Sequence, residues 1–218
     1  MSSSEEWERL PHDASGRLAW VISAPTQDEL KRRYDLWASI YDQDIGRVED
    51  YLAPLAIAEV ATAHLEKDAR ILDAGAGTGL SGQALRDAGF SDLTGLDFAE
   101  EMLSVAREKG IYRETLAADL SKRTRLEDDG FDAVVTVGTT SQVPAESLYE
   151  YVRVTRPGGK IIVANWIKAW NERGYAAIQA EFEREGRLAL VHKGEPFQAL
   201  PTTEPEIVYE IWVFELPG

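Results

Sequence analysis

Cysteine and long apolar runs are both missing from this chain of 218 residues. Without cysteine there is no disulfide framework and no thiolate-ligated zinc site. No apolar run approaches the roughly 20 residues that a bilayer-spanning helix needs. The opening MSSSEEWERL is acidic and polar, and it lacks the basic-then-apolar layout of a secretory signal. These absences predict a cytoplasmic protein that has no membrane partner.

Positive charge is also scarce. The chain carries 23 Lys and Arg against 38 Asp and Glu, which gives a formal net charge of -15. The densest basic segments, residues 31–33 and 122–125, are short and typical of solvated faces. Proteins that bind DNA or RNA neutralise phosphates with clustered Lys and Arg. The sequence therefore disfavours nucleic acid as a partner and favours a small molecule.

The middle of the chain alternates strands and helices. Its apolar pattern predicts strands over 70–74, 93–97, 112–117, 131–137 and 160–165, with helices over 80–88, 100–109, 144–155 and 171–185. The end of the chain differs, because strands over 188–192 and 207–216 have no helix between them. Such a pair is typical of antiparallel strands added to a parallel sheet. The pattern predicts an α/β fold of seven strands, mostly parallel, with helices on both faces.

The N-terminal quarter is interpreted as an arm followed by helices. Residues 1–25 carry apolar side chains without long periodicity, so we predict an arm there. A helix is predicted to begin after Thr26, because Glu29 completes a capping box with it. A second helix is predicted to begin near Pro54, a residue favoured in a first helical turn.

A glycine-rich turn follows the first predicted strand of the sheet. Gly75, Gly77 and Gly79 lack β-carbons, so the backbone can turn sharply and approach a ligand. Parallel α/β sheets bind ligands outside the carboxyl ends of their strands. Asp97 ends the second strand, where a carboxylate can accept from both ribose hydroxyls, and Asp119 follows the third, where it can accept from an adenine amino group. These features predict a site for an adenosine-containing cofactor.

Two kinds of cofactor fit the glycine pattern. The segment from Gly77 to Gly82 satisfies GxGxxG, the fingerprint of dinucleotide-binding enzymes, so an NAD(P)-dependent oxidoreductase is an alternative. Counted from Gly75 the pattern is GxGxG, and Asp73 lies two residues before it. A carboxylate in that position would repel a pyrophosphate but can interact with an ammonium group. This arrangement favours S-adenosylmethionine, which has an ammonium group, a sulfonium group and no phosphate.

Residues 70–165 contain four ordered blocks: ILDAGAGTG, then LTGLDFAEEML, then AADL, and finally FDAVVTVGTT with RPGGKIIVANW. In their order and spacing these blocks resemble the class I S-adenosylmethionine-dependent methyltransferases. The resemblance implies a Rossmann-like, doubly wound sheet of strand order 3-2-1-4-5-7-6 with the last strand antiparallel. It also implies methyl transfer to O, N or C of a small molecule; a regulator that binds the cofactor without catalysis is the alternative. The cofactor contacts that it implies are Asp73, Gly75, Ala76, Gly77, Gly79, Asp97, Phe98, Met102, Asp119, Leu120, Val137 and Gly138.

The aromatic helix ahead of these blocks has a resemblance of its own. The block YDLWASIYDQDIG, residues 34–46, is similar to an N-terminal helix that closes over the cofactor in one subgroup of methyltransferases. Tyr34, Trp37 and Tyr41 recur on one face of this helix, so they are candidates for a lid in contact with the cofactor. The alternative is an aromatic stripe that packs against the core. We expect residues 26–218 to form one domain, with a helical lid over 26–66.

The methyl acceptor is less well marked in the sequence. The segment after the fourth strand lacks the Asn/Asp-Pro-Pro-Tyr/Phe signature of amino-group methylation, which argues against methylation of DNA bases. His192 and Tyr41 are the candidates for a base that acts on an acceptor hydroxyl. The three histidines lack the spacing of metal ligands, so we predict no metal. Residues that could line an acceptor pocket are Thr140, Ser141, Gln142, Asn165 and Trp166.

Overall fold

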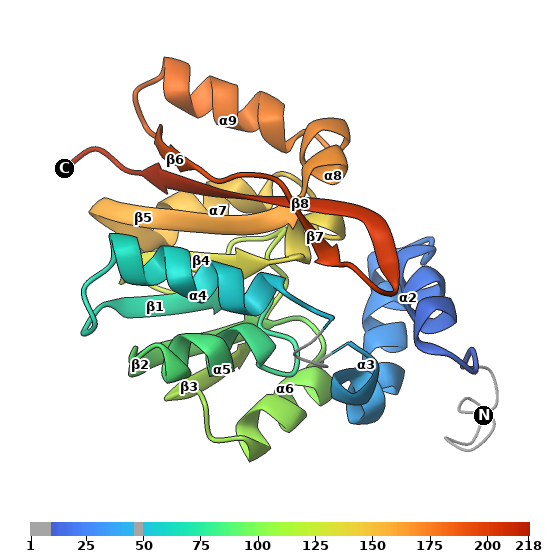
Figure 1. The fold of residues 1–218 in the computed structure, drawn as a ribbon. Coiled ribbons are helices and arrows are strands. Elements are labelled where there is room, and N and C mark those ends of the chain that lie inside the picture. Colours follow the sequence, from blue (N-terminus) through green and yellow to red (C-terminus); the bar gives the residue numbers. More distant parts are fainter. Residues whose placement is uncertain (1–9, 46–49) are drawn as a thin grey trace.

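One mixed sheet organises the computed structural model, which describes residues 10–45 and 50–218. Residues 1–9 of the predicted arm, and Gly46 at the end of the aromatic block, lie outside the described residues. The strands follow the path β3-β2-β1-β4-β5-β8-β6, and β7 pairs with β8 beside this path (Figure 1). Their bounds are β1 Arg70–Ala74, β2 Asp92–Asp97, β3 Glu114–Ala117, β4 Phe131–Val137, β5 Thr155–Trp166, β6 Ala189–Lys193, β7 Phe197–Leu200 and β8 Glu204–Glu215.

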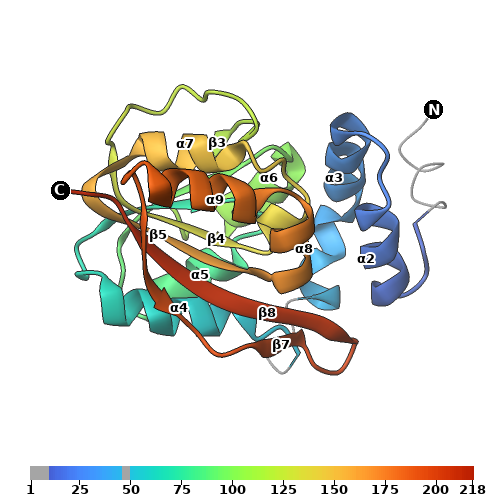
Figure 2. The same cartoon turned by 90° about the horizontal axis from the view of Figure 1, so that it is seen from above.

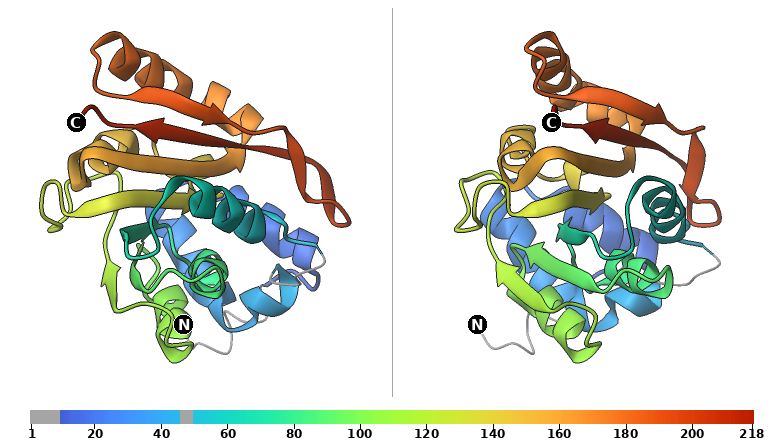
Figure 3. Two further views of the ribbon diagram at one scale, coloured as in Figure 1. Left: turned by 60° about the vertical axis from the view of Figure 1, so that its left-hand side comes forward. Right: turned by 90° about the vertical axis from the view of Figure 1, so that its left-hand side faces the viewer.

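The predicted strand order is confirmed, with β8 in the place of the predicted seventh strand. β8 is antiparallel to both of its neighbours on the path, as the helix-free end of the sequence indicated. The structure adds the short strand β7, which lies within the predicted connection and pairs with β8 through Phe197 and Tyr209. Figure 3 shows the twisted sheet and the hairpin of β7 and β8, which projects beyond the neighbouring strands.

Helices cover both faces of the sheet (Figure 2). On one face α4 (Ala53–His64) and α5 (Leu80–Asp87) bury a shared apolar cluster. On the other face a second cluster is buried beneath α7 (Ser147–Val154), α8 (Ile167–Glu172) and α9 (Tyr175–Arg184). Helix α6 (Glu100–Glu108) packs beside β2 and β3, and the short 3-10 helix η1 (Thr139–Ser141) follows β4.

Strand β5 shows why the sequences of the central strands are almost continuously apolar. Ile161 and Val163 belong to the cluster under α7, whereas Ile162 and Ala164 belong to the cluster under α4. Side chains alternate across a strand, so a strand with helices on both faces needs apolar residues at every position. The position of the core is therefore fixed by the same pattern that predicted the strand.

Two predictions differ from the observed helices: one concerns residues 171–185 and the other the N-terminal arm. The helix expected over 171–185 is divided into α8 and α9, because Gly174 interrupts it and becomes the N-cap of α9. The segment expected as an irregular arm contains α2 (Ala14–Ile22), where the Asp13 carboxylate accepts from the Gly16 amide at 2.6 Å. Nine residues are too few for a long periodic signal, so capping and tertiary contacts decide this helix.

Helices α2 and α3 (Gln27–Asp44) form a cap at the carboxyl edge of the parallel strands (Figure 1). The helix N-cap predicted at Thr26 is confirmed, because the Thr26 hydroxyl accepts from the Glu29 amide. Arg17 of α2 donates to both oxygens of Asp44 at the end of α3, at 2.6 and 2.7 Å. This bidentate pair fastens the two helices to each other. No helix in the described part of the chain has the length and apolar character to cross a membrane.

Candidate active site

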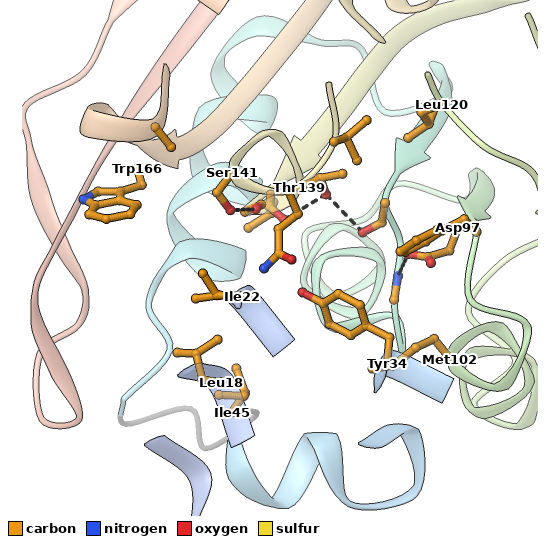
Figure 4. A pocket seen from close by; sticks show the side chains of 18 of the residues that line it. Leu18, Ile22, Tyr34, Ile45, Asp97, Met102, Leu120, Thr139, Ser141 and Trp166 are labelled. Carbon is orange, nitrogen blue, oxygen red and sulfur yellow. Dashed lines mark hydrogen bonds between the residues drawn. The ribbon is translucent and has the colours of Figure 1, made fainter. Parts of the chain in front are cut away.

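A cavity of about 440 Å³ lies between this cap and the carboxyl ends of the strands. Figure 4 shows Asp97 and Met102 on one side of it and Trp166 on the other, with Leu18 and Ile22 of α2 between them. A ligand cleft at this edge agrees with the general rule for open parallel sheets.

The glycine turn forms the floor of the cavity. Gly75 and Gly77 line it, with φ of +81° and +53°, and a β-carbon on Gly75 would lie 2.0 Å from the Thr139 hydroxyl. Glycine is therefore required at residue 75 by conformation and by space. Two other predicted contacts do not line the main cavity: Ala76 faces a smaller pocket beside it, and Gly79 is the N-cap of α5.

Asp97 lies at the end of β2 with its carboxylate in the cavity lining. Its Oδ2 accepts from the Gly77 amide at 2.9 Å, and its Oδ1 accepts from the Ala99 amide at 2.8 Å. Burial raises the pKa of Asp97 to about 6, although these amides act in the opposite direction. The two bonds fix the carboxylate against the glycine turn and leave lone pairs for a ligand.

Asp73 is fully buried at the end of β1 and does not line the cavity. Its Oδ2 accepts from the Ser81 hydroxyl at 2.7 Å and from the Tyr112 hydroxyl at 2.6 Å. Its Oδ1 has no hydrogen-bond partner within residues 10–45 and 50–218. Burial raises the pKa of Asp73 to about 6, against the effect of the two hydroxyls. A buried acceptor of this kind favours a ligand that brings a donor.

Tyr112 is a positioning residue that the sequence did not single out. Its ring fills the space left by two glycines: a β-carbon would lie 2.3 Å from its hydroxyl at Gly82 and 2.9 Å from its ring at Gly95. Gly82, which completes the GxGxxG pattern, thus makes room for a tyrosine that donates to Asp73. The space that Tyr112 needs therefore explains the third glycine of the pattern, and binding of a pyrophosphate is not required to explain it.

Four of the cofactor contacts that the resemblance implies line one end of the cavity: Phe98, Met102, Asp119 and Leu120. Desolvation opposes ionisation of Asp119, but hydrogen bonds from Lys122 and Ser121 hold its pKa below the ordinary value. A carboxylate that stays ionised next to apolar walls can accept from an amino group on a flat ring.

The three aromatic residues of the predicted lid separate into two groups. Tyr34 and Tyr41 line the cavity. Trp37 is fully buried within the cap and does not line the cavity, and its Nε1 donates to Asp44 at 2.6 Å. Trp37 therefore holds the cap together, as in the alternative of a packed aromatic stripe.

Polar contacts fasten α3 to the glycine turn and to α6. The Asp42 carboxylate accepts from the Thr78 hydroxyl at 2.5 Å and pairs with Lys109, also at 2.5 Å. Asp35 accepts from the Glu101 amide at 3.0 Å. Because Thr78 belongs to the glycine turn, the cap and the turn are held as one unit.

Of the five residues predicted to line an acceptor pocket, three line the cavity and two do not. Ser141, Gln142 and Trp166 line the cavity together with Val137 and Gly138. Thr140 and Asn165 are fully buried and do not line it. Asn165 and Trp166 are neighbours on β5, so their side chains point to opposite faces of the sheet.

His192 lies outside the cavity lining, so the structure does not support it as a base there. It lies on the edge strand β6, where it pairs with Val213, and its ring centroid is 5.2 Å from that of His64 in α4. Within the described ranges there is no group of metal-ligating side chains large enough to hold a metal ion. Two lining tyrosines, Tyr51 and Tyr209, were missed by the sequence analysis.

The site suits S-adenosylmethionine better than a dinucleotide. Its carboxylates, Asp73 and Asp97, lie around the glycine turn, where they would repel a pyrophosphate. The free Asp73 Oδ1 instead calls for a donor such as an ammonium group, directly or through water. Asp97 presents acceptors beside Gly77, as paired ribose hydroxyls require.

Comparisons with known proteins agree with this chemistry. A family model described as "Methyltransferase domain" matches residues 72–163. Methyltransferase-like protein 27 of Homo sapiens is 32% identical over 188 residues, which cover 84% of this chain and 76% of that protein. Phosphatidylethanolamine N-methyltransferase of Cereibacter sphaeroides is 34% identical over 63% of this chain and 68% of its own length. Demethylmenaquinone methyltransferase of Renibacterium salmoninarum is 38% identical over 44% of this chain and 41% of its own length.

Solved structures support the fold alone. The [4+2]-cyclase SpnF superposes with a TM-score of 0.70 at 17% identity, over 89% of this chain and 98% of that chain. A methyltransferase solved in complex with the Haloferax volcanii activator Trm112 superposes with a TM-score of 0.63 at 20% identity, over 85% of this chain and 98% of that chain. One of these neighbours is titled a cyclase, so the fold does not assign the reaction. The family model and the relatives do: this chain belongs to the class I methyltransferases, whose methyl donor is S-adenosylmethionine.

Proposed function

We propose that this methyltransferase acts on a small-molecule acceptor, which enters the part of the cavity beyond Gly138. The observation that carries the proposal is the extent of the cavity. Besides the predicted cofactor contacts on β1 to β4, it is lined by Trp166 of β5, Leu200 of β7, and Ile207 and Tyr209 of β8. The bound cofactor supplies a methyl group on a positively charged sulfur, and the chain must align an acceptor with it.

Different residues bind different parts of the cofactor. Asp97 accepts from the ribose hydroxyls, and the cavity end at Phe98 and Met102 receives the adenine. Asp73 is buried behind the cavity wall, so its free Oδ1 acts at the amino-acid end through a bridging water. Tyr34 and Tyr41 close the site as parts of the cap, which excludes water.

A small acceptor fits the charge of the molecule and its relatives. The net charge of -15 opposes binding to nucleic acid. Relatives are named for methylation of phosphatidylethanolamine and demethylmenaquinone, which are both small molecules. The cytoplasmic location is part of the same proposal.

Calorimetric titration with S-adenosylmethionine tests the cofactor, and release of S-adenosylhomocysteine in the presence of pooled metabolites tests the transfer. We expect saturable binding of S-adenosylmethionine and no binding of NAD or NADP. Binding of a nicotinamide nucleotide alone would contradict the proposal. Binding of S-adenosylmethionine without transfer to any pool would favour the non-catalytic regulator.

We predict that cofactor affinity falls steeply below pH 6. Asp73 and Asp97 each have a pKa of about 6 in the free protein, and both bind the cofactor as carboxylates. Each must lose a proton before binding, so the affinity falls by roughly 100-fold between pH 7 and pH 5 when both contribute. Titration in buffers of different ionisation enthalpy will show protons released on binding near pH 6.

The free protein should become more stable as the pH falls, whereas its affinity for the cofactor decreases. A raised carboxyl pKa means that the folded chain binds more protons than the unfolded chain between about pH 4 and pH 6. These two groups therefore stabilise the free fold as the pH falls through this window.

Asp97→Asn removes one titrating group and should lessen the pH dependence of affinity. An unchanged pH dependence in this variant would assign the effect to other groups.

A further inference from the structure

The half of the cavity beyond Gly138 has its own chemistry. Its walls come from the end of β5, from β7 and β8, and from α2 of the cap. Trp166, Leu200, Ile207 and Ile22 supply apolar surface. Figure 4 shows Trp166 on the far side of Ser141 from Asp97, so this chamber lies apart from the predicted ribose site.

Two tyrosine hydroxyls meet at the boundary between the two halves. A β-carbon built on Gly138 would lie 3.0 Å from the Tyr209 hydroxyl and 3.3 Å from the Tyr51 hydroxyl. Tyr51 precedes α4, and Tyr209 lies in β8, so two distant parts of the chain bring these groups to the end of β4. The absence of a side chain at Gly138 leaves both hydroxyls facing the cavity that all three residues line.

Both tyrosines stay protonated at neutral pH. Burial raises the pKa of Tyr209 to about 12, although a hydrogen bond with Tyr51 acts in the opposite direction. Desolvation likewise raises the pKa of Tyr51 well above its ordinary value. Neutral phenols can donate and accept hydrogen bonds, but they do not present a charge to a ligand.

The charged residues of the lining lie away from this boundary. Asp97 and Asp119 belong to the ends of β2 and β3, at the predicted cofactor half. Lys168, Glu172 and Arg173 are exposed residues of and directly after α8. Lys168 lies over the Trp166 ring, 5.5 Å from its centroid, and Arg173 donates to the Ser141 carbonyl. Within the described residues, the boundary at Gly138 therefore offers hydroxyls and apolar surface without a carboxylate to pair a cationic acceptor.

Given the proposed methyl transfer, we propose that Tyr51 and Tyr209 form a binding subsite for the hydroxyl of an uncharged, largely apolar acceptor of the phenol class. The acceptor's phenol hydroxyl lies against the hydrogen-bonded pair of Tyr51 and Tyr209 at Gly138, and its ring lies against Trp166 and Ile207. A hydrogen bond from a tyrosine hydroxyl also favours the ionised form of the acceptor oxygen. The acceptor loses its proton to water, its oxygen then forms the bond to the methyl group as the carbon–sulfur bond breaks, and the cofactor leaves as S-adenosylhomocysteine. An acceptor hydroxyl that is acidic on its own therefore suits a site where the described lining has no base beside Gly138.

Equilibrium dialysis of two probes against the protein saturated with S-adenosylhomocysteine tests this subsite. The probes are 2-naphthol and naphthalene, which share a ring system and differ in the hydroxyl. We expect 2-naphthol to bind more tightly than naphthalene, and Tyr209→Phe or Tyr51→Phe to weaken only 2-naphthol, by roughly 5- to 10-fold. Tyr149→Phe is the matched control, because Tyr149 is an exposed residue of α7 and its hydroxyl donates to Glu181.

The outcomes separate the subsite from the proposed function. Failure of S-adenosylhomocysteine to bind would overturn the proposed function. If it binds but the tyrosine variants weaken both probes equally, the hydroxyls have a structural role and the subsite is refuted. Tighter binding of the cation 1-naphthylmethylamine than of 2-naphthol would also refute the acceptor class. Unchanged binding of S-adenosylhomocysteine in Tyr209→Phe, with selective loss of 2-naphthol, supports the subsite.

Discussion

Gly75→Ala is expected to abolish measurable cofactor binding and to destabilise the fold by about 2–5 kcal/mol. The new β-carbon would lie 2.0 Å from Oγ1, 2.5 Å from Cγ2 and 2.7 Å from Cβ of Thr139. Thr139 cannot simply rotate away, because clashes with its Cβ remain in any rotamer. Either the turn or η1 must move, and both line the cavity. Thermal unfolding and calorimetric titration with S-adenosylmethionine measure the two effects.

Gly110→Ala is the matched control for backbone strain. Gly110 has a φ of +64°, similar to the +81° of Gly75, but a β-carbon there meets nothing within 4 Å. It should therefore cost only the roughly 1–2 kcal/mol of a left-handed alanine and leave affinity unchanged. The double variant Gly75→Ala/Thr139→Gly should recover part of the lost stability, since it relieves the clash but not the strain. Equal effects of Gly75→Ala and Gly110→Ala would show that crowding at Thr139 is unimportant.

The sequence was most informative where one local pattern determines the structure. The apolar run of β4 requires burial on both faces, and the glycines after β1 require a sharp turn. Asp97 and Asp119 follow strands that lie side by side at the same edge, so their place in the cavity also follows from topology. For these elements, predicting where the strand ends also predicts where the site residue lies.

The parts that sequence reasoning missed depend on contacts between distant segments. Tyr209 reaches Gly138 because β8 inserts beside β5, Tyr51 reaches it from the segment before α4, and no local spacing relates the three residues. Trp37 lies on the same helix face as Tyr34 and Tyr41, yet its bond to Asp44 turns it into the interior of the cap. Helical periodicity identifies a face, but it does not distinguish cavity surface from core.

The same limit applies to strand ends. Asn165 and Trp166 were equal candidates in the sequence, and the pleat of β5 directs only Trp166 to the cavity. His192 was a candidate for a base, but β6 is the last strand of the path, separated from β5 by β8, and His192 lies there near His64 of α4, outside the cavity lining. The direction and register of the last strands determine these positions, and both were set by pairing rather than by local residues.

Asp97→Ala is expected to weaken S-adenosylmethionine binding by roughly 100-fold or more. The variant removes the acceptor of paired ribose hydroxyls, and each hydrogen bond to a charged group contributes about 1.5–3 kcal/mol. It also frees the Gly77 and Ala99 amides, so the turn loses a contact that orients it. Calorimetry at pH 8, where the carboxylate of the parent protein is ionised, measures the full effect.

Stability should change much less than affinity in this variant. The Asp97 carboxylate is buried, and its raised pKa shows that desolvation outweighs its two amide bonds. Removing it therefore relieves a buried charge while it costs those bonds, and the two effects offset each other. Asp92→Ala is the matched control at the other end of β2, where an exposed pair with Arg113 contributes at most about 1 kcal/mol. If the two variants bind the cofactor equally well, Asp97 does not hold the ribose, and the proposed orientation of the cofactor in the cavity is wrong.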